Sequence, residues 1–394
     1  MSDTPEPGPE DNPFAGLPMF GDIARMLQGQ GPLNWDIARQ VALGAASGGT
    51  SEGNVDPVVR IAFNELGRIA ELHVAQETGL NLTSGGRSPE FLTVTPGVWA
   101  QRALDAYRPL MVDLATALGR QPGAPDEEPA DPMMSMMAGL SRMMAPSMLG
   151  MAVGSMVGNL AARAFGQYDL PIPRPASHEL LVIPATIDRF ATDWSLAVDE
   201  VRLWVCLQEL AAHALLGVGQ VRDELARLVQ QHVSAFQPDP GALAEKMSAV
   251  DLGDGDPMAA MQQILGNPEL LLGAVESPAQ RAGRPQLDAL VALVVGFVDH
   301  VIDRCAPRLM GGSGAISEAI RRRRIESSPQ DVFVERLLGL SLTRQQVERG
   351  RAFVAGVIER AGDDGLAQLW LRTGTLPTPA ELDAPGLWLA RIEL

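Results

Sequence analysis

The amino-acid sequence predicts a mainly α-helical protein, and three observations support that prediction. Apolar residues recur at three- and four-residue spacing through most of the 394 residues, which is the pattern of amphipathic helices. Helix-start signals, in which Asp or Thr stands directly before Pro, recur along the chain. Only residues 180–183, a short apolar run before Pro184, have the pattern of a strand, so we expect at most a small β element there.

The composition is that of a folded protein with an acidic surface. With 46% hydrophobic and 20% charged residues, the chain can bury a sizeable core. Its formal net charge of −17 argues against a nucleic-acid partner, because such binding needs clustered cationic surface. Residues 321–324, R-R-R-R, are the one basic cluster. We expect them to be a solvated helix face paired with local acids, and a contact with an anionic partner is the alternative.

Changes in composition divide the chain into five segments. Residues 1–12 have the composition of a disordered acidic, Pro-rich tail, 13–120 of a helical region, and 121–131 of a linker or loop. Residues 132–175 are rich in Met and Gly, and 176–394 form a second helical domain. The N-terminus lacks the pattern of a secretory signal, so we expect a cytoplasmic location. Cys206 and Cys305, in apolar contexts without metal-ligand spacing, are expected to be buried and reduced.

In the first 120 residues, apolar periodicity indicates helices near 14–27 and 35–43 and over 57–78. The third begins with Asp56 as N-cap and Pro57 at the first helical position. Thr95 and Pro96 repeat this signal and begin a helix to about residue 119, which Pro109 should kink.

The segment from 132 to 175 has the most unusual composition. Nine of the 17 methionines fall between Met133 and Met156, and residues 143–162 carry no charge. Gly150, Gly154 and Gly158 form a small-x-x-x-small series suited to close helix packing. We expect a helix buried against a partner helix or a second copy; a membrane-associated assembly factor that uses this segment is an alternative.

The remaining helices are expected from the same signals. Periodicity places them over 184–194, from Asp199 as N-cap to about 216, and over 221–236 and 287–309. Further helices are expected over 332–340, 344–361 and 365–371, and Thr378 should cap a short final one with Pro379 at its first position. No repeat of 20–50 residues occurs in the sequence, which disfavours a solenoid.

One of these helices carries a degenerate metal-site motif. Residues 204–216 read W-V-C-L-Q-E-L-A-A-H-A-L-L. In the zinc motif H-E-x-x-H, two histidines one turn apart bind the metal and the glutamate is the general base. Here Glu209 is in place, but Gln208 and Ala212 stand at the histidine positions and His213 comes one residue late. One residue is about 100° around a helix, so His213 does not simply replace residue 212.

Residues 199–213, 290–303, 333–340 and 376–391 resemble a bacterial family of zincin-like hydrolases, usually labelled zinc-dependent metalloproteases. The resemblance spans about 12–394. It implies a zincin-like helical fold, metal-ligand positions at Gln208 and Ala212, a general-base position at Glu209, and a third ligand position, acidic in relatives, at Val295. Since Ala and Val offer no lone pair and an amide is a poor substitute for imidazole, we expect no zinc.

The sequence therefore leaves three functions open. The first is a pseudoenzyme that has lost zinc-dependent peptidase activity and binds an unknown protein or peptide in the old cleft. The second is an active metal-dependent hydrolase with a shifted site at Glu209, His213, Asp299 or His300, since residues i and i+4 share a helix face. The third is the membrane-associated factor described above. No phosphate-binding loop, nucleophile elbow or dinucleotide fingerprint occurs in its required setting.

Overall fold

A computed structural model describes residues 31–119, 132–238, 274–275, 277–325, 337–340 and 342–392; of residues 132–142 only the backbone is described. The expected tail at 1–12, the expected helix at 14–27, the expected loop at 121–131, the segment 239–273 and most of the expected helix at 332–340 lie outside these residues. The described chain is mainly helical, as predicted.

The first helices are α2 (Trp35–Ser47), α3 (Pro57–Thr78), α4 (Pro96–Ala106) and α5 (Arg108–Leu118). Asp56 and Thr95 accept hydrogen bonds from the first-turn amides of α3 and α4, which confirms both predicted N-caps. The helix expected from 96 to 119 is broken at Tyr107, two residues before Pro109, because proline cannot donate the backbone hydrogen bond that a continuous helix needs at that position.

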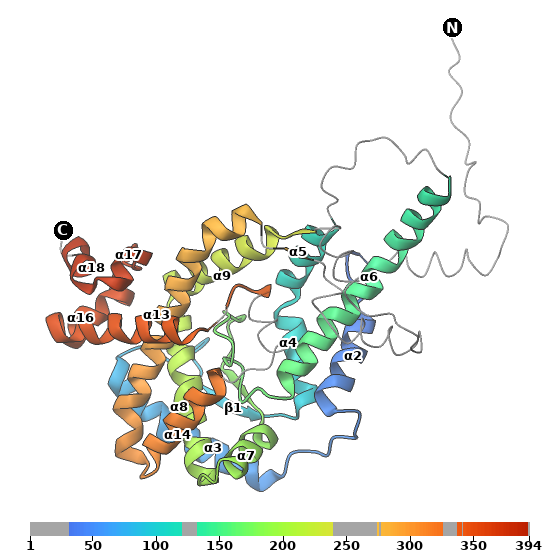
Figure 1. Cartoon of the computed structure of the whole chain (residues 1–394). Helices are drawn as coiled ribbons and strands as arrows, with labels where there is room; N and C mark the ends of the chain where they lie inside the picture. Colours follow the sequence, from blue (N-terminus) through green and yellow to red (C-terminus); the bar gives the residue numbers. More distant parts are fainter. Residues whose placement is uncertain are drawn as a thin grey trace.

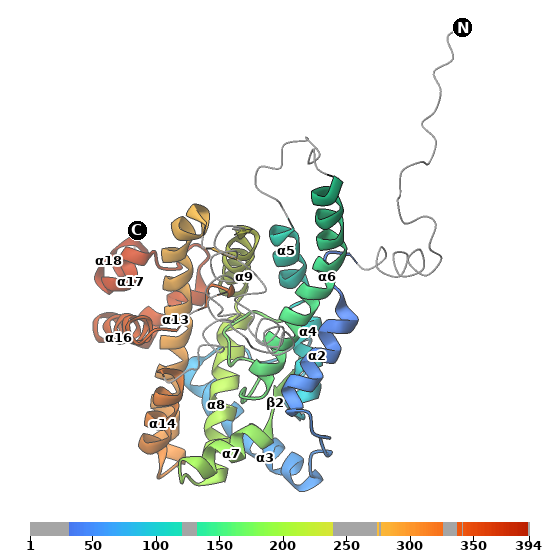
Figure 2. The same cartoon turned by 45° about the vertical axis from the view of Figure 1, so that its right-hand side comes forward.

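The Met/Gly-rich segment forms α6 (Pro132–Ala161), which packs along α2 (Figure 2). The glycines of α6 lie against α2 in register: Gly150 faces Asn34, Gly154 faces Ala38, and Gly158 faces Ala42. A Cβ at any of the three would come within 2.6 Å of a backbone carbonyl oxygen of α2 or its N-cap. The glycine series therefore serves close packing between two helices of the same chain, as its spacing predicted.

No single helix among the described residues is long and apolar enough to cross a membrane. Two later helices, α8 (Val198–Gly217) and α9 (Gly219–Ser234), reach that length and hydropathy only when taken together, and the chain bends by 90° between them. The uncharged stretch of α6 was the basis of the membrane alternative, so that alternative gains no support here.

A small parallel sheet joins the two halves of the chain. Strand β2 (Glu179–Val182) confirms the predicted β element, and its partner β1 (Glu90–Thr93) was not expected. Glu90 pairs with Glu179 and Thr93 with Val182. Val182 also forms an isolated antiparallel bridge with Gly166, so β2 holds the segment after α6 in place. Two further strands, β3 (Gln237–Pro238) and β4 (Ala274–Val275), pair antiparallel.

Helix α7 (Pro184–Asp193) leads into the motif helix α8, and both were predicted. The predicted cap of α8 was wrong: the helix begins at Val198 after Ala197, and Asp199 lies in its first turn. The positive end of the helix dipole also stabilises an acidic side chain in the first turn, so an acid there gives the same sequence signal as an acidic N-cap. Helix α9 follows directly, as expected from 221–236.

The last helices are α13 (Pro278–Leu309), α14 (Ser313–Ile325), α16 (Arg344–Leu371), α17 (Pro379–Asp383) and α18 (Pro385–Ile392). Helix α13 begins nine residues before the predicted start at 287, with a capping box between Ser277 and Gln280. Gly296 of α13 lies directly against Gly350 of α16, so the two backbones cross in contact. At Gly362 the backbone leaves helical geometry, which matches the predicted division between 361 and 365.

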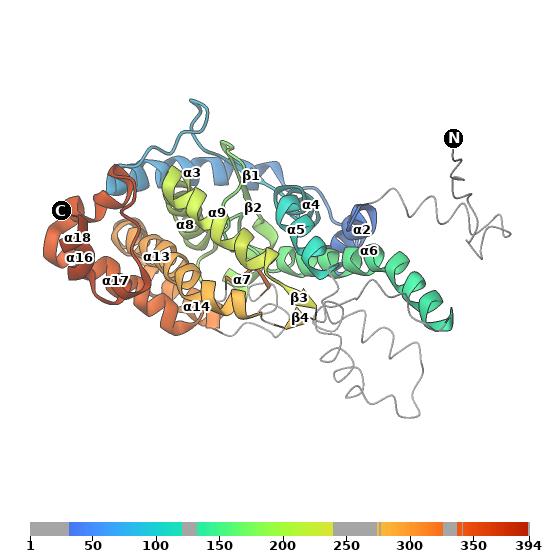
Figure 3. The same ribbon diagram turned by 90° about the horizontal axis from the view of Figure 1, so that it is seen from above.

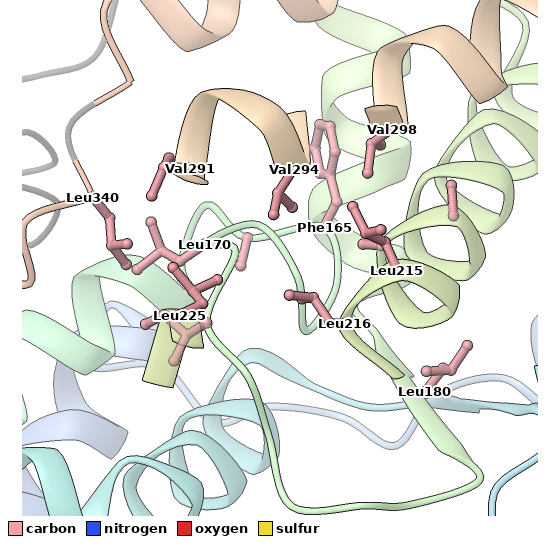
Figure 4. Packing of buried hydrophobic residues seen from close by; sticks show 14 of the residues in the cluster. Phe165, Leu170, Leu180, Leu215, Leu216, Leu225, Val291, Val294, Val298 and Leu340 are labelled. Carbon is pink, nitrogen blue, oxygen red and sulfur yellow. The ribbon is translucent and has the colours of Figure 1, made fainter. Parts of the chain in front are cut away.

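The described elements form an elongated body (Figures 1 and 3). Helices α16, α17 and α18 lie at one end, α2 and α6 at the other, and α8 lies between them. In Figure 4, Leu215 and Leu216 of α8, Val294 and Val298 of α13, and Phe165 of the segment after α6 converge in the buried core. The core thus draws on both sides of the predicted boundary at 175, and the five-segment division stays a prediction.

Candidate functional site

The motif helix α8 is buried along most of its length. Glu209 is fully buried, and Gln208 and Ala212 are 8% and 4% exposed. Leucine, valine and alanine side chains cover most of its circumference, which is the pattern of a central helix rather than a surface one. His213, one residue after the motif, is half-buried.

The three positions that the family resemblance assigns to metal ligands meet at one place. Gln208 and Ala212 of α8 and Val295 of α13 line the same cavity, of about 60 Å³. One turn separates the first two, so they share a face of α8, and α13 packs opposite them. Val295 is far from Gln208 and Ala212 in the sequence, yet the fold brings all three positions to one cavity.

A guanidinium group lies where these positions meet. Arg324 of α14 lines the cavity; its Nη1 donates to the Oδ1 of Asp299 at 3.0 Å and its Nη2 lies 3.5 Å from the Oε1 of Gln208. A second guanidinium, that of Arg351, is 3.8 Å from the Oδ2 of Asp299. Since arginine stays protonated at all physiological pH values, this side of α8 carries a fixed cation.

A second arginine lines the same cavity. Arg323 donates to the Oδ2 of Asp169 at 3.0 Å, and its guanidinium carbon lies 3.8 Å from the ring centre of Phe165. The basic cluster is therefore divided. Arg321 and Arg322 pair with Glu318 on the surface, as predicted, whereas the prediction of a solvated face is wrong for Arg323 and Arg324, which pair with acids from other parts of the chain.

Glu209 points into a different environment. Both carboxylate oxygens face the backbone N–H of Tyr168, at 3.0 and 3.4 Å. Gly166 lies directly against the carboxyl group, since a Cβ there would be 2.3 Å from its Cδ. Burial raises the pKa of Glu209 to about 8; nearby Asp169 adds to the rise, and the Tyr168 N–H and the charge of Arg174 only partly offset it.

His213 lies on the same face as Glu209. Its Nδ1 is 3.1 Å from the hydroxyl of Tyr168, and the two side chains line a second, larger cavity. Burial lowers the pKa of His213, and burial also raises the pKa of Tyr168 well above its usual value. Both groups are therefore neutral at neutral pH, and either can donate to the other, depending on the histidine tautomer.

The shifted metal site is not assembled in the described part of the chain. Asp299 is engaged by Arg324, and the pKa of half-buried His300 is lowered by burial and by Arg304, with Glu77 and Asp363 acting in the opposite direction. Within the described residues, no group of three or more His, Cys, Asp or Glu side chains is placed to hold a metal ion.

The residues at the three positions that the family resemblance assigns to ligands also do not fit zinc. The amide oxygen of Gln208 faces a guanidinium, and Ala212 and Val295 present only methyl groups. Catalytic zinc needs three nitrogen, oxygen or sulfur ligands, and a fixed cation beside the site opposes a divalent ion. Cys206 and Cys305, which could supply thiolates, are both buried, and burial raises the pKa of each thiol.

Several residues of the site had no signal in the sequence. Gly166, Tyr168 and Asp169 belong to the run A-F-G-Q-Y-D, which matches no motif and was included in the Met/Gly-rich segment. They become neighbours of α8 because this run follows α6 and pairs with β2. Arg323 and Arg324 could be recognised in the sequence as part of a basic run. The sequence does not show which way their side chains point, because that depends on how α14 packs against the other helices.

Comparisons with known proteins agree with this fold. A model of the zincin-like metallopeptidase family matches residues 33–389. Among solved structures, the chain is similar to one described as a "putative hydrolase with a novel fold" from Chloroflexus aurantiacus, with 22% identity, a TM-score of 0.62, and coverage of 92% of this chain and 99% of that one. A search of curated proteins found no match. The chain, with its mainly helical body, belongs to the zincin-like metallopeptidase family.

Proposed function

We propose that this protein is a zincin-like family member without zinc-dependent peptidase activity, and that it binds a protein or peptide in the cleft beside α8. One observation supports the loss of zinc above all. The three inherited ligand positions, Gln208, Ala212 and Val295, line a single small cavity, and Arg324 occupies its wall. The cavity has kept its place in the fold while its ligand atoms have been replaced.

The protonation state of Glu209 supports the same proposal. A general base must be ionised to accept a proton, and a pKa of about 8 leaves most of this carboxyl group protonated at pH 7. Its oxygens are also engaged by the Tyr168 N–H, and Glu209 is not among the residues that line the cavity of Gln208. Glu209 then acts as a buried anchor for the 163–169 segment.

Zinc content is the direct test. We expect the chain, saturated with zinc and passed through a desalting column, to retain much less than one zinc per chain by plasma mass spectrometry. The triple substitution Gln208→His, Ala212→His, Val295→Glu rebuilds the inherited ligand set, and combining it with Arg324→Met removes the competing cation. We expect zinc retention to rise in the rebuilt chain, and most of all without Arg324.

The matched control places two histidines at the same spacing on an exposed face. Arg227 and Gln231 lie four residues apart on the surface of α9, so Arg227→His with Gln231→His measures adventitious binding by a histidine pair. One zinc per chain in the unaltered protein, lost on Glu209→Gln or His213→Ala, would overturn the proposal in favour of the shifted-site hydrolase.

A further inference from the structure

A second cavity beside α8 is lined by both polar and apolar side chains. It has a volume of about 590 Å³ and lies on the side of Tyr168 where His213 is found. Its walls come from the loop after α3, from α4, from residues 174–179 and from the end of α8. Hydrogen-bonding side chains such as Asn81, Gln167 and Ser177 line it, and it has the size of a small-ligand or peptide site.

Three arginines and two carboxylates line this cavity, and their pairing is unequal. Asp105 is paired with Arg39, which lies outside the cavity wall, at 3.4 Å. Glu179 is paired with Arg102 at 3.9 Å. Arg222 is paired with its neighbour Asp223 at 2.8 Å.

Arg174, the third arginine, has no carboxylate within ion-pair distance among the described residues. Instead, its Nη2 donates to the hydroxyl of Tyr107 at 3.1 Å, and its guanidinium lies over the rings of Trp99 and Tyr107, at 5.4 and 5.0 Å from their centres. Its Nε is buried and has no hydrogen-bond partner in the described part of the chain. Trp99 is in turn held by its indole N–H, which donates to the Gly166 carbonyl.

These contacts fix the guanidinium without neutralising it. Aromatic rings favour a cation through their negative faces, and they hold the planar group in one orientation. A guanidinium held in this way is suited to pair with a carboxylate through two parallel hydrogen bonds. One uncommitted positive charge matches a ligand with one negative charge, which favours a carboxylate over a phosphate dianion.

We propose that the cavity binds a carboxylate-bearing ligand through Arg174, with the C-terminal carboxylate of a peptide as the fitting source. The hydroxyl of Tyr168 and the imidazole of His213 lie on the same wall and supply neutral hydrogen-bonding groups to the rest of the ligand. This inference rests on the proposed peptide-binding function and names the chemical group that the site recognises.

The experiment compares matched probes on the full chain. A fluorescently labelled pool of random tetrapeptides with free C-termini is titrated by anisotropy beside the same pool with amidated C-termini; acetate and inorganic phosphate serve as competitors. We expect the free acid to bind at least tenfold more tightly than the amide, a difference of about 1.4 kcal/mol. If only acetate binds, and not the peptides, the peptide source is overturned and the ligand is a small carboxylate.

Variants then locate the charge. We expect Arg174→Gln to weaken acid binding about tenfold or more, and Arg174→Lys to have an intermediate effect, because it keeps the charge and loses the planar fork. Arg222→Gln, which lines the same cavity but is paired with Asp223, is the matched control and should bind as the unaltered chain does. Equal binding of acid and amide, stronger competition by phosphate than by acetate, or no binding of any carboxylate would each overturn the proposal.

The two proposals can fail separately. The acid-to-amide ratio is measured on the unaltered chain and needs no variant to fold. Stoichiometric zinc with intact carboxylate binding would remove the proposed loss of peptidase chemistry and leave the Arg174 site standing. Absence of zinc together with equal binding of acid and amide would leave the proposed loss of peptidase chemistry standing and would remove the Arg174 site.

Discussion

The two faces of α8 that meet at Gln208 and Glu209 differ in almost every physical respect. The face of Gln208 and Ala212 looks onto a small cavity walled by arginines and aliphatic side chains. The face of Glu209 and His213 is covered by the 163–169 segment and bonded to Tyr168. Successive residues of a helix point about 100° apart, so one position separates the residue that lines the small cavity from the residue that is bonded to Tyr168.

The two faces satisfy their buried acids in different ways. On the first face, the guanidinium of Arg324 pairs with the buried acid Asp299. On the second face, the buried carboxyl group of Glu209 accepts a hydrogen bond from the Tyr168 N–H of the neighbouring segment. Four changes would test this comparison, and they follow from the largest expected effect to the smallest.

Arg324→Met should have the largest effect, because it leaves the buried carboxylate of Asp299 with only the more distant Arg351. Breaking a buried pair in this way costs about 3 kcal/mol, and chemical denaturation would measure the loss of unfolding free energy. Arg322→Met is the matched control on the same helix, since its partner Glu318 is on the surface, and it should change stability little. Similar losses for both variants would mean that the buried Arg324–Asp299 pair contributes no more than a surface pair.

Gly166→Ala tests the packing on the second face. The new methyl group would meet the carboxyl of Glu209, and overpacking of this kind costs about 2 kcal/mol. Shortening the acid by Glu209→Ala in the same chain should recover part of that loss. A double-mutant cycle by denaturation measures the coupling, and additive effects would contradict the contact.

The pH dependence of stability follows from the raised pKa of Glu209. The folded state holds this proton up to about pH 8, whereas the unfolded state releases it near 4.5, so unfolding free energy should fall as pH rises from 4.5 to about 8. One full proton corresponds to a slope of about 1.4 kcal/mol per pH unit, and the slope falls to about half of that value as pH reaches the folded pKa of about 8. Measurement from about pH 7 to 8 limits the contribution of His213, because its folded pKa is lowered and an unfolded histidine is mostly neutral above a pKa of about 6.5.

Glu209→Gln should flatten this slope, because glutamine keeps the shape of the side chain and carries no titratable proton. The comparison of the two chains over the same pH range cancels the contribution of all other groups. Equal slopes would place the Glu209 carboxyl in its ordinary ionised state and would restore it as a candidate general base.

Tyr168→Phe should have the smallest effect. It removes one hydroxyl that bonds to half-buried His213, at a cost of about 1 kcal/mol, while the backbone N–H to Glu209 stays. Thermal unfolding of the single variant and of its combination with His213→Ala measures the pair. The second substitution should cost less in a chain that already carries Tyr168→Phe; a full additional loss would show that the two side chains are not coupled.

Much of the local structure was accessible from sequence because it depends on neighbouring residues. Asp56, Thr95 and Thr378 cap their helices as predicted, since a cap is a bond within one turn. The glycine series of α6 packs as expected, because its spacing matches the helical period. The early start of α13 was missed because Pro285 interrupts the pattern that Ser277 begins.

The candidate site was only partly accessible. The resemblance placed Gln208, Ala212 and Val295 at equivalent positions, and the structure gathers them at one cavity. It could not place Arg324 or Tyr168, which come from α14 and from the 163–169 segment. Their contacts with α8 span 116 and 41 residues of sequence, and no local rule connects such distant positions.

The sequence by itself determined the helical class, most helix limits and which residues stand at the motif positions, because period, caps and residue identity are local properties. Only the tertiary structure decided what surrounds those residues. Burial next to Gly166 raises the pKa of Glu209. The packing of α14 places Arg323 and Arg324 of the basic run at the wall of the small cavity. Electrostatics and packing depend on distances between elements, and those distances exist only after the chain has folded.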